Sequence, residues 1–80
     1  MSRWAKDTLG KLKKKFTFPN YRQCFAFVSE VAMLAEKKNH HPEIILDYDK
    51  VIISIISHDV KKITKRDIEL AALIDKIYSS

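Results

Sequence analysis

The spacing of apolar residues changes several times along this chain, and the order of these changes constrains its fold more than any other feature. From Leu12 to Phe18, apolar and polar residues alternate, which is typical of a strand with one buried face, although Lys14 falls on the apolar side. From Tyr21 to Lys38, apolar residues recur at steps of three and four, as on an amphipathic helix. The sequence therefore predicts a strand and then a helix, separated at Pro19 and Asn20.

The end of this helix is predicted from the residues around its last turn. Lys37 and Lys38 complement the negative end of the helix dipole, and Asn39 readily adopts the left-handed conformation that ends many helices. Pro42 disfavours helical geometry at the residue before it. We therefore expect the helix to end beside His40.

The second half of the chain predicts two strands and a second helix. Glu43 to Tyr48 and Lys50 to His58 are rich in Ile and Val, and we expect them to form an antiparallel hairpin with a tight connection at residues 47–50. Both faces of the second strand are largely apolar, so it should be central in its sheet. Thr64 and Asp67 resemble a capping box at the start of the final helix.

A short strand near Trp4 completes the predicted order of elements. We expect an α+β fold, in which a small antiparallel sheet of about four strands has helices packed on one face. Eighty residues make one domain. At this size only about 60% of the surface of the unfolded chain can be buried on folding. Self-association, as a homodimer or homotetramer, would therefore add stability.

Composition excludes several classes of protein. The hydrophobic fraction of 46%, with one Gly and two Pro, is too high for a disordered chain. A single cysteine, Cys24, cannot form an internal disulfide, which favours a reducing compartment. The longest strongly apolar run, residues 51–56, is far shorter than the roughly 20 residues of a membrane span. We expect a cytoplasmic protein with no membrane partner.

The formal net charge is +5, and basic residues are concentrated near the N-terminus. They interleave with Leu12, Phe16 and Phe18, so we interpret them as the solvated face of a strand, which can also attract an acidic partner. Nucleic-acid binding is the alternative, but no recognition motif or stacking pattern accompanies the lysines. Nucleic acid is therefore not the partner that we expect.

The three histidines are the main candidates for chemistry. His40 and His41 adjoin at a helix-to-strand junction, and His58 lies at a strand end. If the hairpin turns near Tyr48, residue 57 or 58 lies opposite this pair, within side-chain reach. Imidazoles with an ordinary pKa of about 6.5 exchange protons at neutral pH, as general acid/base catalysis requires.

Three interpretations of these histidines remain open at this point. They can be surface residues without a function. They can form a zinc site of three His and a water, although neighbouring side chains diverge on an extended chain and no Cys or paired carboxylate lies at ligand spacing. The third interpretation is proton transfer without a metal.

A longer pattern around the histidines resembles the signature of a known family. The run from Glu36 to Pro42 is followed by Tyr48, His58 and Asp67 at the spacing of the pterin-4a-carbinolamine dehydratases. The similarity extends over nearly the whole chain. It includes Phe16-Thr17-Phe18 before the pattern and Arg66-Asp67-Ile68 at its end.

Two departures from the animal members of that family bear on substrate affinity more than on acid/base chemistry. Those enzymes carry Asp before the His pair and an aromatic residue two positions after the Pro, whereas this chain has Asn39 and Ile44. They also begin with an additional helix. We therefore expect residues 1–80 to form a single, short dehydratase domain that lacks this leading helix.

The resemblance implies a hydro-lyase that removes water from 4a-hydroxytetrahydrobiopterin, giving quinonoid dihydrobiopterin in tetrahydrobiopterin recycling. The pterin is then the substrate, and no cofactor or metal is expected. A different class of function is also implied, because animal members act as dimerisation cofactors for a transcription factor and other members assist enzyme assembly. A protein-binding scaffold is therefore the alternative.

The resemblance also implies roles for individual residues. His40 and His58 are expected to be the acid/base groups, with His41 completing the catalytic set by positioning the substrate. Four further residues are expected around the substrate: Glu36, Asn39, Pro42 and Ser57. Glu36 precedes His40 by four residues and could face the histidines, or it could be an ordinary exposed carboxylate. Asp67 is expected to be structural, capping the last helix.

Overall fold

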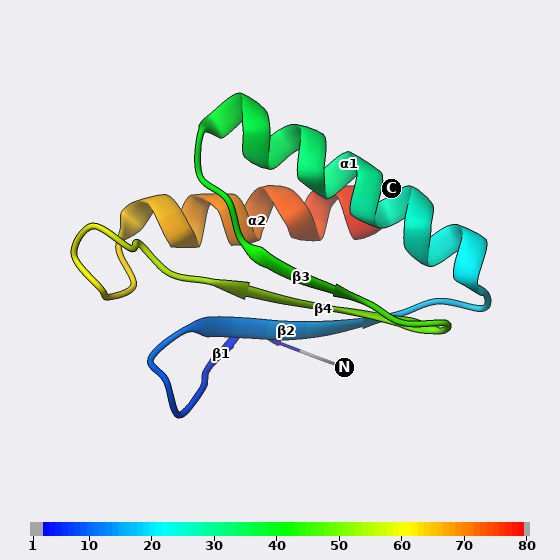
Figure 1. Cartoon of the computed structure of the whole chain (residues 1–80), viewed down its shortest axis with the longest axis horizontal. Helices are drawn as coiled ribbons and strands as arrows, with labels where there is room; N and C mark the ends of the chain where they lie inside the picture. The colour runs from blue at the N-terminus through cyan, green and yellow to red at the C-terminus, as the bar shows by residue number, and fades with distance from the viewer. Residues whose placement is uncertain (1–2, 80) are drawn as a thin grey trace.

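The computed structural model describes residues 3–79, which form a four-stranded antiparallel sheet and two helices. The elements are β1 (Ala5–Lys6), β2 (Leu12–Thr17), α1 (Tyr21–Lys38), β3 (Glu43–Leu46), β4 (Lys50–Ile55) and α2 (Lys65–Ser79). The strand order is β1-β2-β4-β3, with every neighbouring pair antiparallel. Both helices lie on one face of the sheet (Figure 1), which confirms the predicted fold class and the central position of β4.

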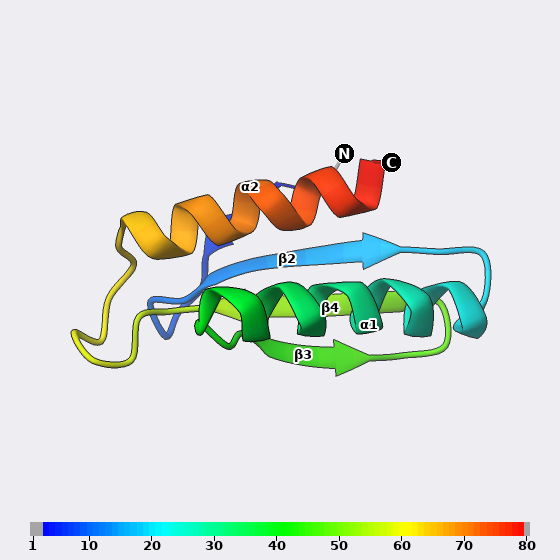
Figure 2. The same ribbon diagram turned by 90° about the horizontal axis from the view of Figure 1, so that it is seen from above.

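The core lies between the sheet and the helices. Viewed from above, α1 runs along β4 and α2 runs along β2 (Figure 2). The alternation of β2 and β4 turns one set of side chains towards the helices, as the apolar period requires. The residues that form this core are Phe16, Cys24, Phe27, Val31, Val51, Ile53, Ile55, Leu70, Ala71 and Ile74.

Lys14, the exception in the pattern of β2, reaches a carboxylate on α2. Its Nζ lies 2.7 Å from Asp75 Oδ1, which also accepts a hydrogen bond from Trp4 Nε1 at 3.0 Å. The same ammonium lies 4.9 Å from the ring centroid of Phe16. A lysine is therefore tolerated on the apolar side because its charge is paired at the margin of the core.

The two ends of α1 are fixed by asparagines. Asn20 Oδ1 accepts a hydrogen bond from the N–H of Gln23 at 2.9 Å, as an N-cap does. Asn39 has a φ of 52° and a ψ of 42°, which confirms the predicted left-handed residue. The next residue, His40, donates its backbone N–H to the carbonyl oxygen of Ala35 at 3.0 Å. This closing bond sets the direction in which His40 leaves the helix.

β3 and β4 both end earlier along the chain than predicted. β3 stops at Leu46, and Tyr48 lies in the exposed turn that follows. β4 stops at Ile55, beyond which Ser57 makes an isolated antiparallel bridge to Lys62.

Neither of the helices in residues 3–79 is long and apolar enough to cross a membrane.

Candidate active site

His40 is paired with a buried carboxylate on the other helix. Its Nε2 lies 2.6 Å from Oδ1 of Asp67, the third residue of α2. The Asp67 side chain is 0% exposed and that of His40 is 12% exposed. The pair joins the end of α1 to the first turn of α2, two elements that are far apart in the sequence.

The second carboxylate oxygen of Asp67, Oδ2, accepts hydrogen bonds from two other residues. Oδ2 accepts hydrogen bonds from Ser57 Oγ at 2.7 Å and from the backbone N–H of Thr64 at 2.7 Å. The Thr64 hydroxyl lies 3.3 Å from the same oxygen and 2.8 Å from Ser57 Oγ. The bond from Thr64 N is the one that a capping box makes. The same side chain thus caps α2 and holds His40.

These contacts decide the charge of Asp67. Burial alone would raise the pKa of the carboxyl, but the hydrogen bonds from Ser57, Thr64 and His40 outweigh it and hold the pKa below the ordinary value. Asp67 is therefore ionised at neutral pH and acts only as an acceptor. It follows that His40 donates from Nε2, which leaves Nδ1 as the ring nitrogen that can exchange a proton.

His41, the neighbour of His40, is paired with a different carboxylate. Its Nε2 lies 2.8 Å from Oε1 of Glu36, but these side chains are 58% and 81% exposed. The sequence predicted that Glu36, four residues before His40, could face the histidines, and its contact with His41 agrees with this. The helix ends at Lys38 and Asn39 is left-handed, so His40 pairs with Asp67 and His41 is the histidine that Glu36 contacts.

His58 is exposed in the turn that follows β4. Its two neighbours are both tied to α2, because Ser57 bonds to Asp67 and Oδ1 of Asp59 lies 2.6 Å from Nη2 of Arg66. The connection between α1 and β3 and the loop between β4 and α2 lie at the same end of the molecule (Figure 1). Among residues 3–79, however, no hydrogen bond joins His58 to another histidine.

We predicted that the start of β3 and the end of β4 lie close together, and Asp67 contacts a residue from each of these regions, His40 and Ser57. Glu43 pairs with Ser54, and continuing that register beyond the strands sets residue 40 opposite residue 57. Asn39 has its backbone N–H in the helix cap and its side chain exposed, and Pro42 is half-buried directly before β3. Of the predicted site residues, His40, Ser57 and Asp67 are thus brought together directly.

A small cavity of about 160 Å³ lies beside His40, between the last turn of α1 and α2. Leu70 and Leu73 provide apolar walls, and Lys38, Arg66 and Glu69 provide charges. The sequence did not identify these wall residues, because the spacing of the two leucines on the helix predicts only that they pack in the core. The cavity and the free Nδ1 of His40 together offer an apolar space with an acid/base group at its edge.

Within the described part of the chain, no three His, Cys, Asp or Glu side chains are grouped so that they could hold a metal ion. This absence does not test the expectation of catalysis without a metal, which stays a prediction. The donor set around Asp67 consists instead of two hydroxyls, an amide and an imidazole. Such a set fixes the position and tautomer of His40.

Comparisons with known sequences identify relatives over most of the chain. A family model described as pterin 4 alpha carbinolamine dehydratase matches residues 1–77. A protein of Prochlorococcus marinus (strain NATL2A), named "Putative pterin-4-alpha-carbinolamine dehydratase", is 46% identical over 69 residues, which are 86% of this chain and 73% of that one. A protein of the same name from Paraburkholderia xenovorans (strain LB400) is 41% identical over 66 residues, covering 82% and 69% of the two chains.

Two solved structures share the fold. A transcriptional coactivator/pterin dehydratase from Brucella melitensis superposes with a TM-score of 0.88 at 30% identity, over 94% of this chain and 81% of that one. A pterin dehydratase-like protein, identified as a RuBisCO assembly factor in the alpha-carboxysome, superposes with a TM-score of 0.82 at 26% identity, over 96% and 90% of the two chains.

Proposed function

This chain belongs to the pterin 4 alpha carbinolamine dehydratase family, and from that premise we propose that it dehydrates a 4a-hydroxytetrahydropterin. The product is the quinonoid dihydropterin, so the reaction serves the recycling of tetrahydrobiopterin. One observation carries the proposal: His40 borders a small cavity and is held there by a fully buried, ionised carboxylate. A histidine fixed in this way is a suitable acid/base group for an elimination.

The reaction breaks the bond between C4a and the hydroxyl oxygen and forms a double bond between C4a and the adjacent ring nitrogen. That nitrogen loses its proton, and the departing hydroxyl gains one and leaves as water. One group must therefore accept a proton and another must donate one. We assign these roles to His40 and His58. Nδ1 of His40 is the exchanging atom, because Nε2 is bonded to Asp67.

The remaining residues of the site position these groups and the pterin. His41, with Glu36, and the exposed side chain of Asn39 are assigned to the substrate, on a chain path set by Pro42. Ser57 is 1% exposed, and its hydroxyl and backbone are already bonded within the protein. We therefore assign Ser57 to holding Asp67 rather than to contacting the pterin as the sequence suggested.

The experiment follows the decay of a 4a-hydroxytetrahydropterin by its absorbance, with and without the protein and in the presence of a chelator. We expect acceleration that the chelator leaves unchanged. His40→Ala and His58→Ala should each lower kcat by about 100-fold, the usual contribution of a general acid or base. Loss of activity on chelation would contradict chemistry without a metal. Full activity of both variants would contradict the assigned roles.

We also propose that the protein is a homodimer or homotetramer. The outward face of α1 carries the exposed side chains of Tyr21, Phe25 and Met33, which is more apolar surface than one helix in water requires. Sedimentation at micromolar concentration should show a dimer or tetramer. A 9.3 kDa monomer would contradict this proposal.

A second candidate function is a protein-binding scaffold without catalysis as its main role. It is favoured by the two structural relatives, one described as a transcriptional coactivator and the other as an assembly factor. Under this proposal the chain would bind a protein partner, such as a transcription factor, through the surface that it uses for self-association. The dehydration assay separates the two functions, because a scaffold would leave the decay of the pterin at its uncatalysed rate.

A further inference from the structure

The net charge of the protein comes entirely from its first 20 residues. That segment holds six Lys and Arg and one Asp, whereas residues 21–80 hold nine of each sign. The six cations are Arg3, Lys6, Lys11, Lys13, Lys14 and Lys15. The segment forms β1, β2 and their connection, so the excess positive charge lies at one edge of the sheet. Such an asymmetry bears on partners rather than on the fold.

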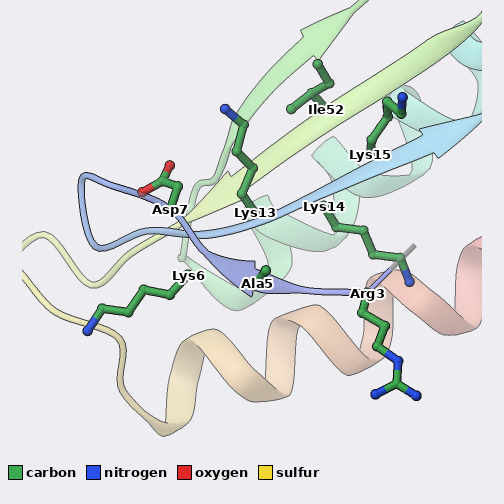
Figure 3. Close-up of a pocket in the computed structure, with 8 residues that line it drawn as sticks. All are labelled: Arg3, Ala5, Lys6, Asp7, Lys13, Lys14, Lys15 and Ile52. Carbon is green, nitrogen blue, oxygen red and sulfur yellow. The ribbon is translucent and has the colours of Figure 1, made fainter. Parts of the chain in front are cut away.

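The cations divide between the two faces of the sheet. Lys14 turns to the helix side, where Asp75 pairs with it. Lys13 and Lys15 project from β2 on the opposite side (Figure 3), as the period of two requires. The one carboxylate of the segment, Asp7, accepts hydrogen bonds from the backbone N–H groups of residues 9 and 11 at 2.9 Å. Within residues 3–79, neither Lys13 nor Lys15 has an ion-pair partner.

Apolar side chains lie directly beside these lysines. The strand register sets Lys15 opposite Ile52, and Ile52 opposite Ile45 on β3. Cross-strand partners share a face, so both isoleucines belong to the side of the sheet that the helices leave bare. Ile45 is 45% exposed. An open groove of about 460 Å³ extends from Ile52 past the lysines to Arg3 and Lys6 (Figure 3).

We propose that this basic sheet face, formed by Lys13, Lys15, Ile45 and Ile52 with Arg3 at its margin, binds an acidic polypeptide in which carboxylates alternate with apolar side chains. Carboxylates would pair with Lys13, which interacts electrostatically with Asp7 but forms no ion pair among the described residues, and with Lys15, and the apolar side chains would cover the two isoleucines. The site lies on the other side of the sheet from the His40–Asp67 pair, so it is independent of the proposed dehydration.

A polypeptide fits this face better than a nucleic acid does. A phosphate backbone would satisfy the cations but would leave the isoleucines uncovered. The face also offers no stack of rings for bases, because Trp4, Phe16 and Phe18 pack with other rings on the helix side. The partner that matches both parts of the surface is therefore a polypeptide in which negatively charged and apolar side chains alternate.

The test measures binding by fluorescence anisotropy at low salt. The probe is a labelled peptide in which Glu and Val alternate, and the comparison probes are the same peptide with Val replaced by Gly and a thymidine oligonucleotide of equal charge. The variant is Lys13→Gln with Lys15→Gln. Its matched control is Arg22→Gln with Lys37→Gln, which removes the same charge from exposed positions of α1 that have no ion pair among the described residues.

We expect the Glu-Val peptide to bind most tightly, and the Lys13 and Lys15 variant to weaken that binding about fivefold to tenfold, with less than twofold change in the control. Ile45→Ser should weaken binding of the Glu-Val peptide but not of the Glu-Gly peptide. Equal weakening in both double variants would show an effect of net charge alone and overturn the proposal. Tighter binding of the oligonucleotide, or no binding of the peptide at low salt, would also overturn it.

Discussion

The two neighbouring histidines make the same kind of contact in opposite surroundings. His40 and Asp67 are 2.6 Å apart and almost fully buried, whereas His41 and Glu36 are 2.8 Å apart and mostly exposed. Water screens the second pair, and both of its members can leave it without cost to the core. In the first pair the carboxylate has lost its water and depends on its protein donors. Burial, rather than distance, separates a pair that stabilises the fold from one that solvent screens.

The network around Asp67 also explains why the buried pair is tolerated. Each carboxylate oxygen has at least one donor, and Oδ2 has two from Thr64 and one from Ser57. A buried charge with a donor on each oxygen avoids most of the cost of an unpaired one. Among residues 3–79, Glu36 has a hydrogen bond only with His41, and its side chain is 81% exposed. We therefore expect mutations of the His40–Asp67 pair to lower stability and activity much more than mutations of the His41–Glu36 pair.

Asp67→Asn should produce the largest effect, because the amide cannot accept from all the donors that the carboxylate serves. We expect the free energy of unfolding to fall by about 3 kcal/mol, measured by urea denaturation. We also expect kcat for dehydration to fall by about 100-fold and its pH profile to change, because His40 would lose its fixed tautomer. A variant within about 0.5 kcal/mol of the original protein would contradict the importance of the buried network.

The pH dependence of stability should reveal the same difference. The pKa of Asp67 is lowered in the folded protein, so ionised Asp67 stabilises the fold above its unfolded pKa of about 3.9, and this contribution is lost as the pH falls through the folded value. We expect the difference in unfolding free energy between the original protein and Asp67→Asn to be constant above about pH 5 and to shrink below about pH 4. A difference that grows on acidification would have the wrong sign.

A smaller effect is expected from the ion pair beside His58. Arg66→Gln removes the partner of Asp59, and we expect kcat to fall about threefold to fivefold because the turn that carries His58 becomes less well positioned. Lys65→Gln is the matched control, since Lys65 precedes Arg66 and pairs at 3.9 Å with Glu69 on the same helix. Equal losses of kcat in the two variants would remove the specific role of the Arg66–Asp59 pair.

The smallest effect is expected from Glu36→Gln. The exposed pair with His41 contributes little to folding, so the urea midpoint should stay unchanged and kcat should stay within about twofold, while KM rises modestly. Steady-state kinetics and urea denaturation measure both quantities. A loss of stability comparable with that of Asp67→Asn would erase the distinction between the two pairs.

Most of the fold could be predicted because the local signals agree with one another. The bounds of α1, the left-handed Asn39 and the central position of β4 all follow from periodicity and capping. Lys14 could be recognised as an exception, but its partner Asp75 lies 61 residues away. No local pattern can specify such a contact, because it depends on how α2 packs across the sheet.

The site could be predicted only in part, for the same reason. A capping box predicts the bond from Thr64 N to Asp67, since both residues lie in one turn. The bond from His40, just after α1, to Asp67 on α2 links residues 27 positions apart, and from the sequence we expected Asp67 only to cap its own helix. Helical spacing predicted that Glu36 could face the histidines, and it does contact His41, but the choice between His41 and His40 depends on the path of the chain beyond the helix end.

The most direct measurement compares kcat for dehydration of a 4a-hydroxytetrahydropterin by His40→Gln and His41→Gln, prepared and assayed side by side. We expect kcat of His40→Gln to fall by about 100-fold, because that residue exchanges the proton. His41→Gln should keep a kcat near that of the original protein and show a raised KM, because it positions the substrate. A larger loss of kcat in His41→Gln than in His40→Gln would contradict the catalytic role of the buried pair.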